Sequence, residues 1–332
     1  ERYLYKLDRP AVDQIAIYDT YDWRLFNNAL TLHRSGQGLV LRSLENASPQ
    51  EGVLAAVEPN FAWDLPQSAL RDRLERIVKV RALLKLAEVE MRSTQFNILN
   101  EDEKTVGRLL YKEYALVQNG GQTALRSHIE LLPIRGYPKY ERQLVKLLKK
   151  AGCKAIQGDE LTPMALEAAG KRPGSYSSKL NYRLKRKQRA DEASKVILRQ
   201  MLAIMRANEA GIKADIDTEF LHDYRIAVRR TRSLLSQNRR VFAAETTERF
   251  KRDFRVLGKR TNELRDLDVY LLSEGKFEAA LPDELQEDIK PLFNYLKERR
   301  QTAIADVVEA LESQTSTRIS VDWQTCLRAP SA

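Results

Sequence analysis

The chain has 332 residues, of which 43% are hydrophobic and 31% charged, with a formal net charge of +10. This length suffices for two folded domains, and the positive charge favours an anionic partner without saying which one. The chain has only two cysteines, far apart in sequence, and no apolar run approaches ~20 residues; this excludes a disulfide framework and a membrane-spanning helix and favours the cytoplasm.

The N-terminal part is predicted to be rich in strands, because apolar and polar residues alternate along it. A helix is predicted at Leu65–Lys79, where leucines recur at helical spacing. Turns are expected at Gly36-Gln37-Gly38 and at Asn119-Gly120-Gly121. The predicted strands are Tyr3–Leu7, Ile15–Asp19, Leu30–His33, Leu39–Leu44, Gly52–Pro59, Leu83–Arg92, Gln95–Asn100, Gly107–Val117 and His128–Leu132.

A helix at Tyr140–Lys150, ended by Gly152, closes this first domain at residue 152. Residues 153–174 hold two prolines and several glycines, which predict a linker carrying a short helix at Met164–Ala169. The fold class is therefore α+β: an antiparallel, β-rich domain at 1–152 precedes an all-α domain at 175–332.

Long helices are predicted in the C-terminal domain, and their short connections indicate an antiparallel bundle. The first spans Tyr176–Ala210. The second is capped by Asp217 or Thr218 and runs to Phe242, and the third is capped by Thr246 or Thr247 and runs to Leu272. The last spans Pro282–Glu312, with a kink or a break expected at Pro291.

Basic residues gather in this second domain. From Lys171 to Arg265 there are 25 Lys and Arg against 11 Asp and Glu, a net charge of +14, so the remaining chain sums to −4 (10 − 14). The anion-attracting surface therefore belongs to the helical part.

Two predicted helices each carry a basic ridge opposite an apolar face. On the second helix the basic residues fall within an arc of about 80°: His222, Arg225, Arg229, Arg232 and Arg240. On the third helix the ridge is Arg252, Arg255 and Lys259. Stacked like charges repel, and a phosphate chain would remove that penalty. Two simpler interpretations stay open: a solvated basic face, and a histidine that only makes a structural hydrogen bond.

The stretch Phe220–Arg232, which reads FLHDYRIAVRRTR, strongly resembles the signature of CHAD domains, the conserved-histidine α-helical family. The stretch Leu264-Arg265-Asp266-Leu267-Asp268-Val269 resembles it too. The resemblance covers Tyr176 to about Trp323 and implies two related four-helix bundles that bind inorganic polyphosphate in a basic pore or groove. The binding residues that we expect are His222, Arg225, Arg229, Arg230, Arg232, Arg240, Arg252, Arg255 and Lys259.

One departure from that family matters. No second His-x-x-Arg-x-x-x-Arg helix is found before Ala332. A truncated domain, a half domain and a site completed by a second copy in a homodimer are the alternatives. In the Arg265-Asp266-x-Asp268 cluster, two carboxylates could bind a metal, but we favour ion pairs that hold neighbouring arginines.

The N-terminal domain resembles CYTH domains, the triphosphate tunnel family, which commonly precede CHAD domains. The resemblance rests on Tyr18–Leu25, Leu30–Arg34 and Ser127–Leu131 and spans residues 1–152. It implies a β-tunnel whose acidic residues hold Mg²⁺ or Mn²⁺ and whose basic residues hold a triphosphate.

This sequence departs from the tunnel family where the metal would bind. Of the expected Glu-x-Glu-x-Lys opening only Glu1 remains, and Glu130 is the last of an alternating acidic set. Hard cations need several oxygen ligands, so we predict a degenerate tunnel with Glu1 and Glu130 as weak candidates. The remaining basic residues, which could be an ordinary β-surface, are Arg24, Arg34, Arg42, Lys85 and Arg92.

The leading hypothesis is therefore non-catalytic binding of inorganic polyphosphate, without a cofactor. The alternative is an Mg²⁺- or Mn²⁺-dependent triphosphatase in the N-terminal domain. A nucleic-acid partner is less favoured, because aromatic residues that would stack on bases are missing from the ridges.

Overall fold

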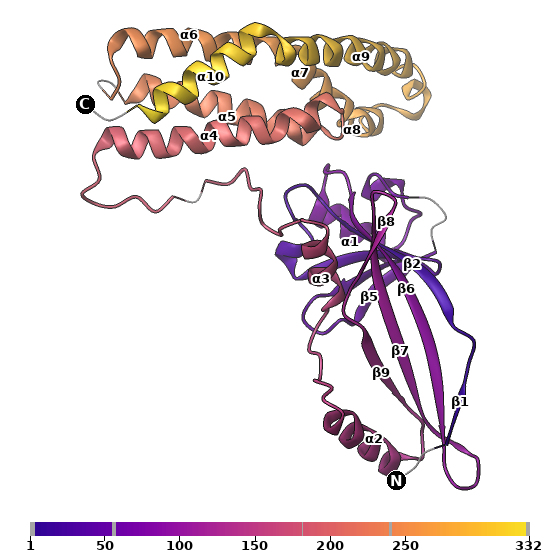
Figure 1. The fold of residues 1–332 in the computed structure, drawn as a ribbon. Helices are drawn as coiled ribbons and strands as arrows, with labels where there is room; N and C mark the ends of the chain where they lie inside the picture. Colours follow the sequence, from indigo (N-terminus) through magenta and orange to yellow (C-terminus); the bar gives the residue numbers. More distant parts are fainter. Residues whose placement is uncertain (1–3, 55–57, 181, 239–240, 330–332) are drawn as a thin grey trace. The chain divides into compact units, whose positions relative to one another are not determined.

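The computed structural model describes residues 4–54, 58–180, 182–238 and 241–329. The chain forms two compact units, Glu1–Tyr176 and Ser177–Ala332. The first is built on an antiparallel β-sheet and the second is helical, so the predicted α+β class is confirmed (Figure 1).

The described residues of the first unit form a sheet of nine strands, all paired antiparallel. Its main order is β5-β4-β3-β2-β6-β7-β8, with β1 also on β6 and β9 also on β7. The described strands form an open sheet, since no pairing joins β5 to β8 or β9. The strands are β1 (Leu4–Leu7), β2 (Ala11–Asp19), β3 (Leu30–Ser35), β4 (Gly38–Ser43), β5 (Pro49–Val53), β6 (Leu84–Leu99), β7 (Thr105–Gln118), β8 (Gly121–Ala124) and β9 (His128–Pro133).

Both predicted turns are confirmed. Gly36 and Gln37 join β3 to β4, and Asn119 and Gly120 join β7 to β8 with positive φ angles at both positions, as a type I′ hairpin requires. The two strands predicted on either side of Thr94 are one strand, β6. It pairs with β7 along nearly its whole length and with β2 and β1 in succession on its other edge.

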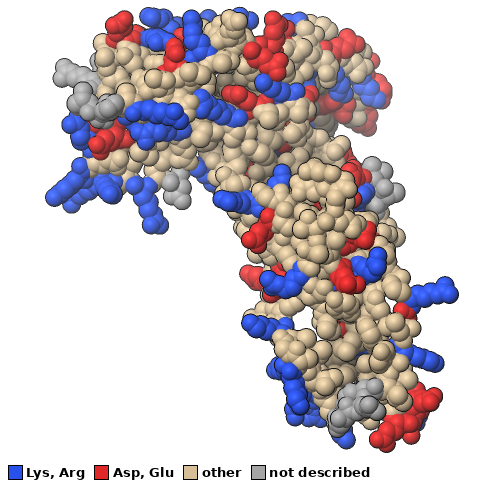
Figure 2. All heavy atoms as spheres, viewed as in Figure 1, with Lys and Arg blue, Asp and Glu red and all other residues tan. Residues whose placement is uncertain are grey.

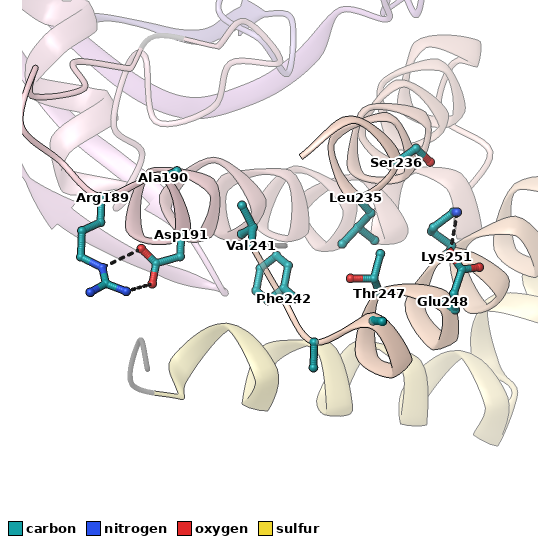
Figure 3. Close-up of a pocket in the computed structure, with 12 residues that line it drawn as sticks. Arg189, Ala190, Asp191, Leu235, Ser236, Val241, Phe242, Thr247, Glu248 and Lys251 are labelled. Atoms are coloured by element: carbon teal, nitrogen blue, oxygen red, sulfur yellow. Dashed lines mark hydrogen bonds and ion pairs between the residues drawn. The ribbon is translucent and has the colours of Figure 1, made fainter. Parts of the chain in front are cut away.

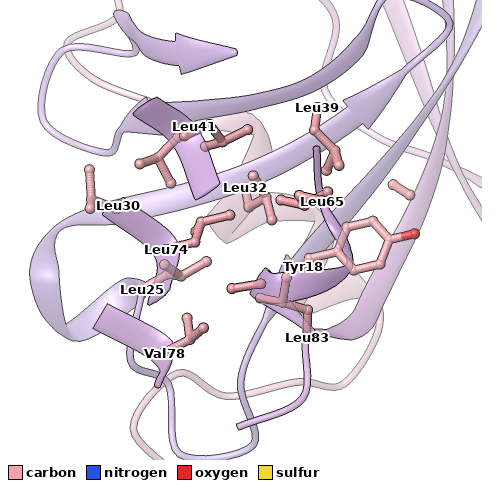
Figure 4. Close-up of a cluster of buried hydrophobic side chains, with 13 residues drawn as sticks. Tyr18, Leu25, Leu30, Leu32, Leu39, Leu41, Leu65, Leu74, Val78 and Leu83 are labelled. Atoms are coloured by element: carbon pink, nitrogen blue, oxygen red, sulfur yellow. The ribbon is translucent and has the colours of Figure 1, made fainter. Parts of the chain in front are cut away.

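One face of the sheet packs on helix α1 (Ala69–Val78), within the helix predicted at 65–79. Leu70, Leu74 and Val78 of α1 are fully buried against leucines of β3 and β4 (Figure 4). Ser68 caps the helix by accepting a hydrogen bond from the Arg71 amide at 3.2 Å.

The opposite face packs on helix α3 (Leu161–Ala168). Leu161 and Ala165 are buried among apolar residues of β2, β6 and β7. The segment expected to be a linker thus contributes to the core of the first unit. Helix α2 (Pro138–Lys150) covers the far end of the sheet, where Leu144 is buried beside Ile98.

The second unit contains seven α-helices in its described residues (Figure 1). Asp217, one of the two predicted caps, accepts hydrogen bonds from the amides of Glu219 (2.9 Å) and Phe220 (3.3 Å). The helices are α4 (Ala190–Lys213), α5 (Thr218–Gln237), α6 (Ala244–Arg260), α7 (Asn262–Leu271), α8 (Glu274–Ala279), α9 (Lys290–Glu312) and α10 (Gln314–Arg328).

Several predicted helix bounds are wrong. The first helix begins at Ala190, since the described residues 177–180 and 182–189 precede it outside any helix or strand. The third begins at Ala244 without a side-chain cap and breaks at Thr261. Pro291 lies in the first turn of α9, where a missing amide costs nothing, and causes no kink.

Close packing holds the bundle together. A Cβ added at Gly211 of α4 would overlap the buried ring of Phe220 on α5, so this glycine lets the two helices approach. On α10, Trp323 is fully buried and packs against Phe250 and Phe254 of α6, with ring centroids 4.5 and 5.5 Å away.

Candidate anion-binding groove

Three helices of the second unit, α5, α6 and α7, enclose a groove of about 410 Å³. The two basic ridges predicted from the sequence meet in it. Its polar and basic lining residues are His222, Arg225, Arg229 and Arg232 from α5, Arg255 and Lys259 from α6, and Asn262 and Arg265 from α7.

Three expected residues lie elsewhere or are not described. Arg230 and Arg252 are exposed and do not line the groove. Arg240 lies outside the described residues. The carboxylates of the Arg265-Asp266-x-Asp268 cluster were predicted to hold neighbouring arginines by ion pairs, and Asp268 does so by pairing with Arg300 of α9 at 2.7 Å. Arg265 lines the groove, and its place in the second motif was the signal that could have identified it.

The six cations of the groove have no carboxylate partner. Among the described residues, none of them forms an ion pair; they are Arg225, Arg229, Arg232, Arg255, Lys259 and Arg265. Elsewhere in the same unit some cations are neutralised, for example Lys297 by Glu274 at 2.8 Å and Arg299 by Glu263 at 2.6 Å, whereas others, such as the exposed Arg252 and Arg318, form no ion pair with the described residues. The groove therefore concentrates positive charge that no ion pair with a described carboxylate neutralises.

Arg225 also shapes the groove. Its Nη1 donates to the Gly258 carbonyl (3.2 Å), to Thr261 Oγ1 (2.7 Å) and to Asn262 Oδ1 (2.9 Å). These acceptors lie at the break between α6 and α7, where helix carbonyls lose their intrahelical partners. All three are neutral, so the guanidinium keeps its full charge. Burial and the charges of Arg265 and Arg229 lower the pKa of Arg225, against the opposing pull of Asp266.

His222 lies half-buried beside these arginines. Burial, followed by the positive charge of Arg265, lowers the pKa of His222, although Glu219 and Asp223 act in the opposite direction. The imidazole is therefore neutral at pH 7 in the protein alone. An anion bound in the groove would stabilise the protonated form of His222, because its negative charge would offset the positive charge of the surrounding arginines.

A larger cavity of about 1200 Å³ lies where α4 begins and α5 ends (Figure 3). Its basic residues are neutralised locally. Arg189 pairs with Asp191 at 3.1 Å, and Lys251 pairs with Glu248 at 2.8 Å. Size alone therefore does not indicate an anion site; the uncompensated charge is in the smaller groove.

The basic residues predicted for a remnant tunnel are mostly paired. Arg24 pairs with Asp22, and Arg34 and Lys85 share Glu58. Arg92 is exposed on β6. Arg42 lines a cavity of about 370 Å³ beside the start of α3 and donates to the carbonyl of Ala47.

That cavity of the first unit also contains two histidines. His33 is buried and lies 2.8 Å from Thr162 Oγ1, and burial lowers the pKa of His33 to about 4. Burial also lowers the pKa of His128, whose Nε2 is 4.0 Å from Glu160. The cavity thus holds neutral imidazoles among mixed charges rather than a set of cations.

The described residues do not fit a divalent-cation site. No group of three or more His, Cys, Asp or Glu side chains among them is placed to hold a metal ion. Glu130 is half exposed and pairs with Lys112 at 2.6 Å, and Glu1 lies outside the described residues. Mg²⁺ and Mn²⁺ require several oxygen ligands together, and the described side chains do not supply them at one place.

One known protein family matches part of the helical unit. Residues 196–332 match the CHAD domain family. The match spans all the helices that line the groove and is consistent with the polyphosphate-binding family that the sequence resembles. It lies outside the N-terminal unit, for which the tunnel resemblance stays a prediction. No curated protein matches the chain. Among the described residues, no helix is both long and apolar enough to cross a membrane.

Proposed function

We propose that the helical unit binds inorganic polyphosphate in the groove between α5, α6 and α7. The single observation that carries the proposal is the set of six groove cations without a carboxylate partner among the described residues. Arginine forks and lysine ammonium groups are the usual partners of phosphate oxygens. The match of residues 196–332 to the CHAD domain family supports the same ligand.

The shape of the groove favours a thin, flexible polyanion. Its cations come from three helices within one volume of about 410 Å³, which suits a ligand with closely spaced charges. No Phe, Tyr or Trp is among the described residues that line it. Proteins that bind single-stranded nucleic acid use such rings to stack on bases, so nucleic acid is the less favoured polyanion.

The proposed setting is the cytoplasm. Cys153 and Cys326 are free, in keeping with a reducing compartment. Binding needs no cofactor, because the cations themselves supply the opposite charge.

Calorimetric titration with long-chain polyphosphate tests the proposal. The groove variant is Arg229→Gln/Arg255→Gln/Lys259→Gln, which removes three cations whose side chains form no hydrogen bond or ion pair with the described residues. Partly exposed charge-assisted hydrogen bonds contribute about 1 kcal/mol each, so we expect affinity to fall by about 100-fold. Binding by the unchanged protein should also weaken steeply with salt, since screening acts on every contact.

The matched control is Lys290→Gln/Lys297→Gln/Arg299→Gln. It removes the same charge from exposed cations that already pair with Glu287, Glu274 and Glu263. We expect it to bind nearly as the unchanged protein does. Equal weakening in both variants would mean that net charge, not the groove, drives binding. The absence of measurable binding by the unchanged protein at low salt would defeat the proposal.

A further inference from the structure

The segment that leads into α4 carries a second group of cations. Residues 183–187 include four of them, Arg183, Lys185, Arg186 and Lys187, and all four are exposed. None of them forms an ion pair with a carboxylate that the structure describes. The next cation along the chain, Arg189, does have an acidic partner, because it pairs with Asp191 at 3.1 Å. Figure 2 shows Lys and Arg side chains projecting from this part of the helical unit.

This segment has a defined local conformation. The Gln188 amide donates to the Lys185 carbonyl at 2.9 Å, and the Lys185 amide donates to Gln188 Oε1 at 3.3 Å. The two hydrogen bonds close a turn between Lys185 and Gln188. Three of the four cations, Lys185, Arg186 and Lys187, are therefore presented on a formed turn at the surface, and Arg183 precedes it.

Tyr182, directly before the segment, lies within electrostatic range of Arg230 on α5, the helix that supplies most of the groove. Burial raises the pKa of Tyr182, and the nearby positive charge of Arg230 opposes that shift. The Tyr182 hydroxyl is buried and has no hydrogen-bond partner among the described residues. Arg230 follows Arg229, which lines the groove, and both are exposed on α5. Arg230 is thus next to the groove residue Arg229 in sequence and near Tyr182 in space.

We propose that the segment Arg183–Lys187 is a second contact site for the same polyphosphate chain, reached from the groove across Arg230. The inference rests on the proposed function and adds a length preference to it. A long chain would bind the groove and the segment together, whereas a short one would fill the groove alone. Joining two contacts on one ligand raises affinity because the second contact forms at high effective concentration.

The test compares tripolyphosphate with long-chain polyphosphate on the full chain. The variant is Arg183→Gln/Lys185→Gln/Arg186→Gln/Lys187→Gln, which changes only exposed residues outside any helix or strand. We expect its affinity for the long chain to fall at least about tenfold, and the slope of log K against log salt to flatten by about 3. Its affinity for tripolyphosphate should not change.

A charge-matched control is Lys213→Gln/Lys290→Gln/Lys297→Gln/Arg299→Gln, whose four cations are all paired. It should retain the preference for the long chain. Unchanged long-chain affinity in the segment variant, or equal weakening for both ligands, would overturn the inference while leaving groove binding in place. Failure of the unchanged protein to bind either ligand would overturn the proposed function and the inference with it.

Discussion

Replacing Arg229 by glutamine should stabilise the helical unit in the absence of a ligand while weakening its hold on polyphosphate. Arg229 is exposed, lines the groove and forms no ion pair with the described residues. It lies one helical turn from Arg225 on one side and from Arg232 on the other. Removing its charge therefore relieves the repulsion from Arg225 and Arg232.

The size of this effect follows from the helix spacing. A like-charge pair at i,i+3 or i,i+4 costs about 0.2–0.5 kcal/mol, so two pairs amount to about 0.4–1 kcal/mol. Arginine and glutamine have similar intrinsic helix propensities, so the substitution changes mainly the charge. For a unit of this size, the gain corresponds to a rise in Tm of about 1–4 °C.

Scanning calorimetry at low and high salt would measure the change. We expect the stabilisation at about 20 mM salt and its loss near 1 M, where the Debye length is about 3 Å. Arg299→Gln is the control, because Arg299 pairs with Glu263 and its loss should bring no stabilisation. A variant at Arg229 that is destabilised at low salt, or equally stabilised at both, would refute the idea that the groove is electrostatically strained.

Two further predictions concern His222 and Gly211. Burial and the charge of Arg265 lower the pKa of His222 in the free protein, and a bound polyanion should raise it. Binding therefore takes up a proton. The affinity for polyphosphate should then increase as the pH falls from about 8 to about 6, by at most tenfold per pH unit. Titrations at several pH values should show this dependence lost in His222→Asn, and its persistence there would assign the proton to another group. Gly211→Ala should lower the Tm of the helical unit, because the new methyl would overlap the Phe220 ring and overpacking costs about 1–3 kcal/mol. Gly275→Ala, with nothing within 4 Å of the added Cβ, should not lower it, and equal effects would contradict the close-packing argument.

Local patterns predicted the elements that depend on near neighbours. Asp217 caps α5 through amides two and three residues away, and the turn at Asn119-Gly120 is set by residues that tolerate positive φ. Helix α10 was missed, although Ile319, Trp323 and Leu327 are buried at a spacing of four. That spacing was a readable signal of a buried helical face.

Other boundaries depend on distant residues. The strand β6 is continuous because β2 and β1 pair with it one after the other. The local pattern of residues in β6 does not predict this pairing. The break between α6 and α7 is held by Arg225, whose guanidinium reaches the Gly258 carbonyl from 33 positions away in the sequence. A periodicity confined to one helix contains no information about such a contact.

The amino-acid sequence by itself determined the fold class and the basic and apolar faces of α5 and α6, because those faces follow from the 3.6-residue period of a single helix. Only the tertiary structure decided that the faces converge, that Arg265 joins them, and that Asp268 and Glu263 pair with α9 instead. Those outcomes depend on how separate helices pack, which brings together charges that are far apart along the chain.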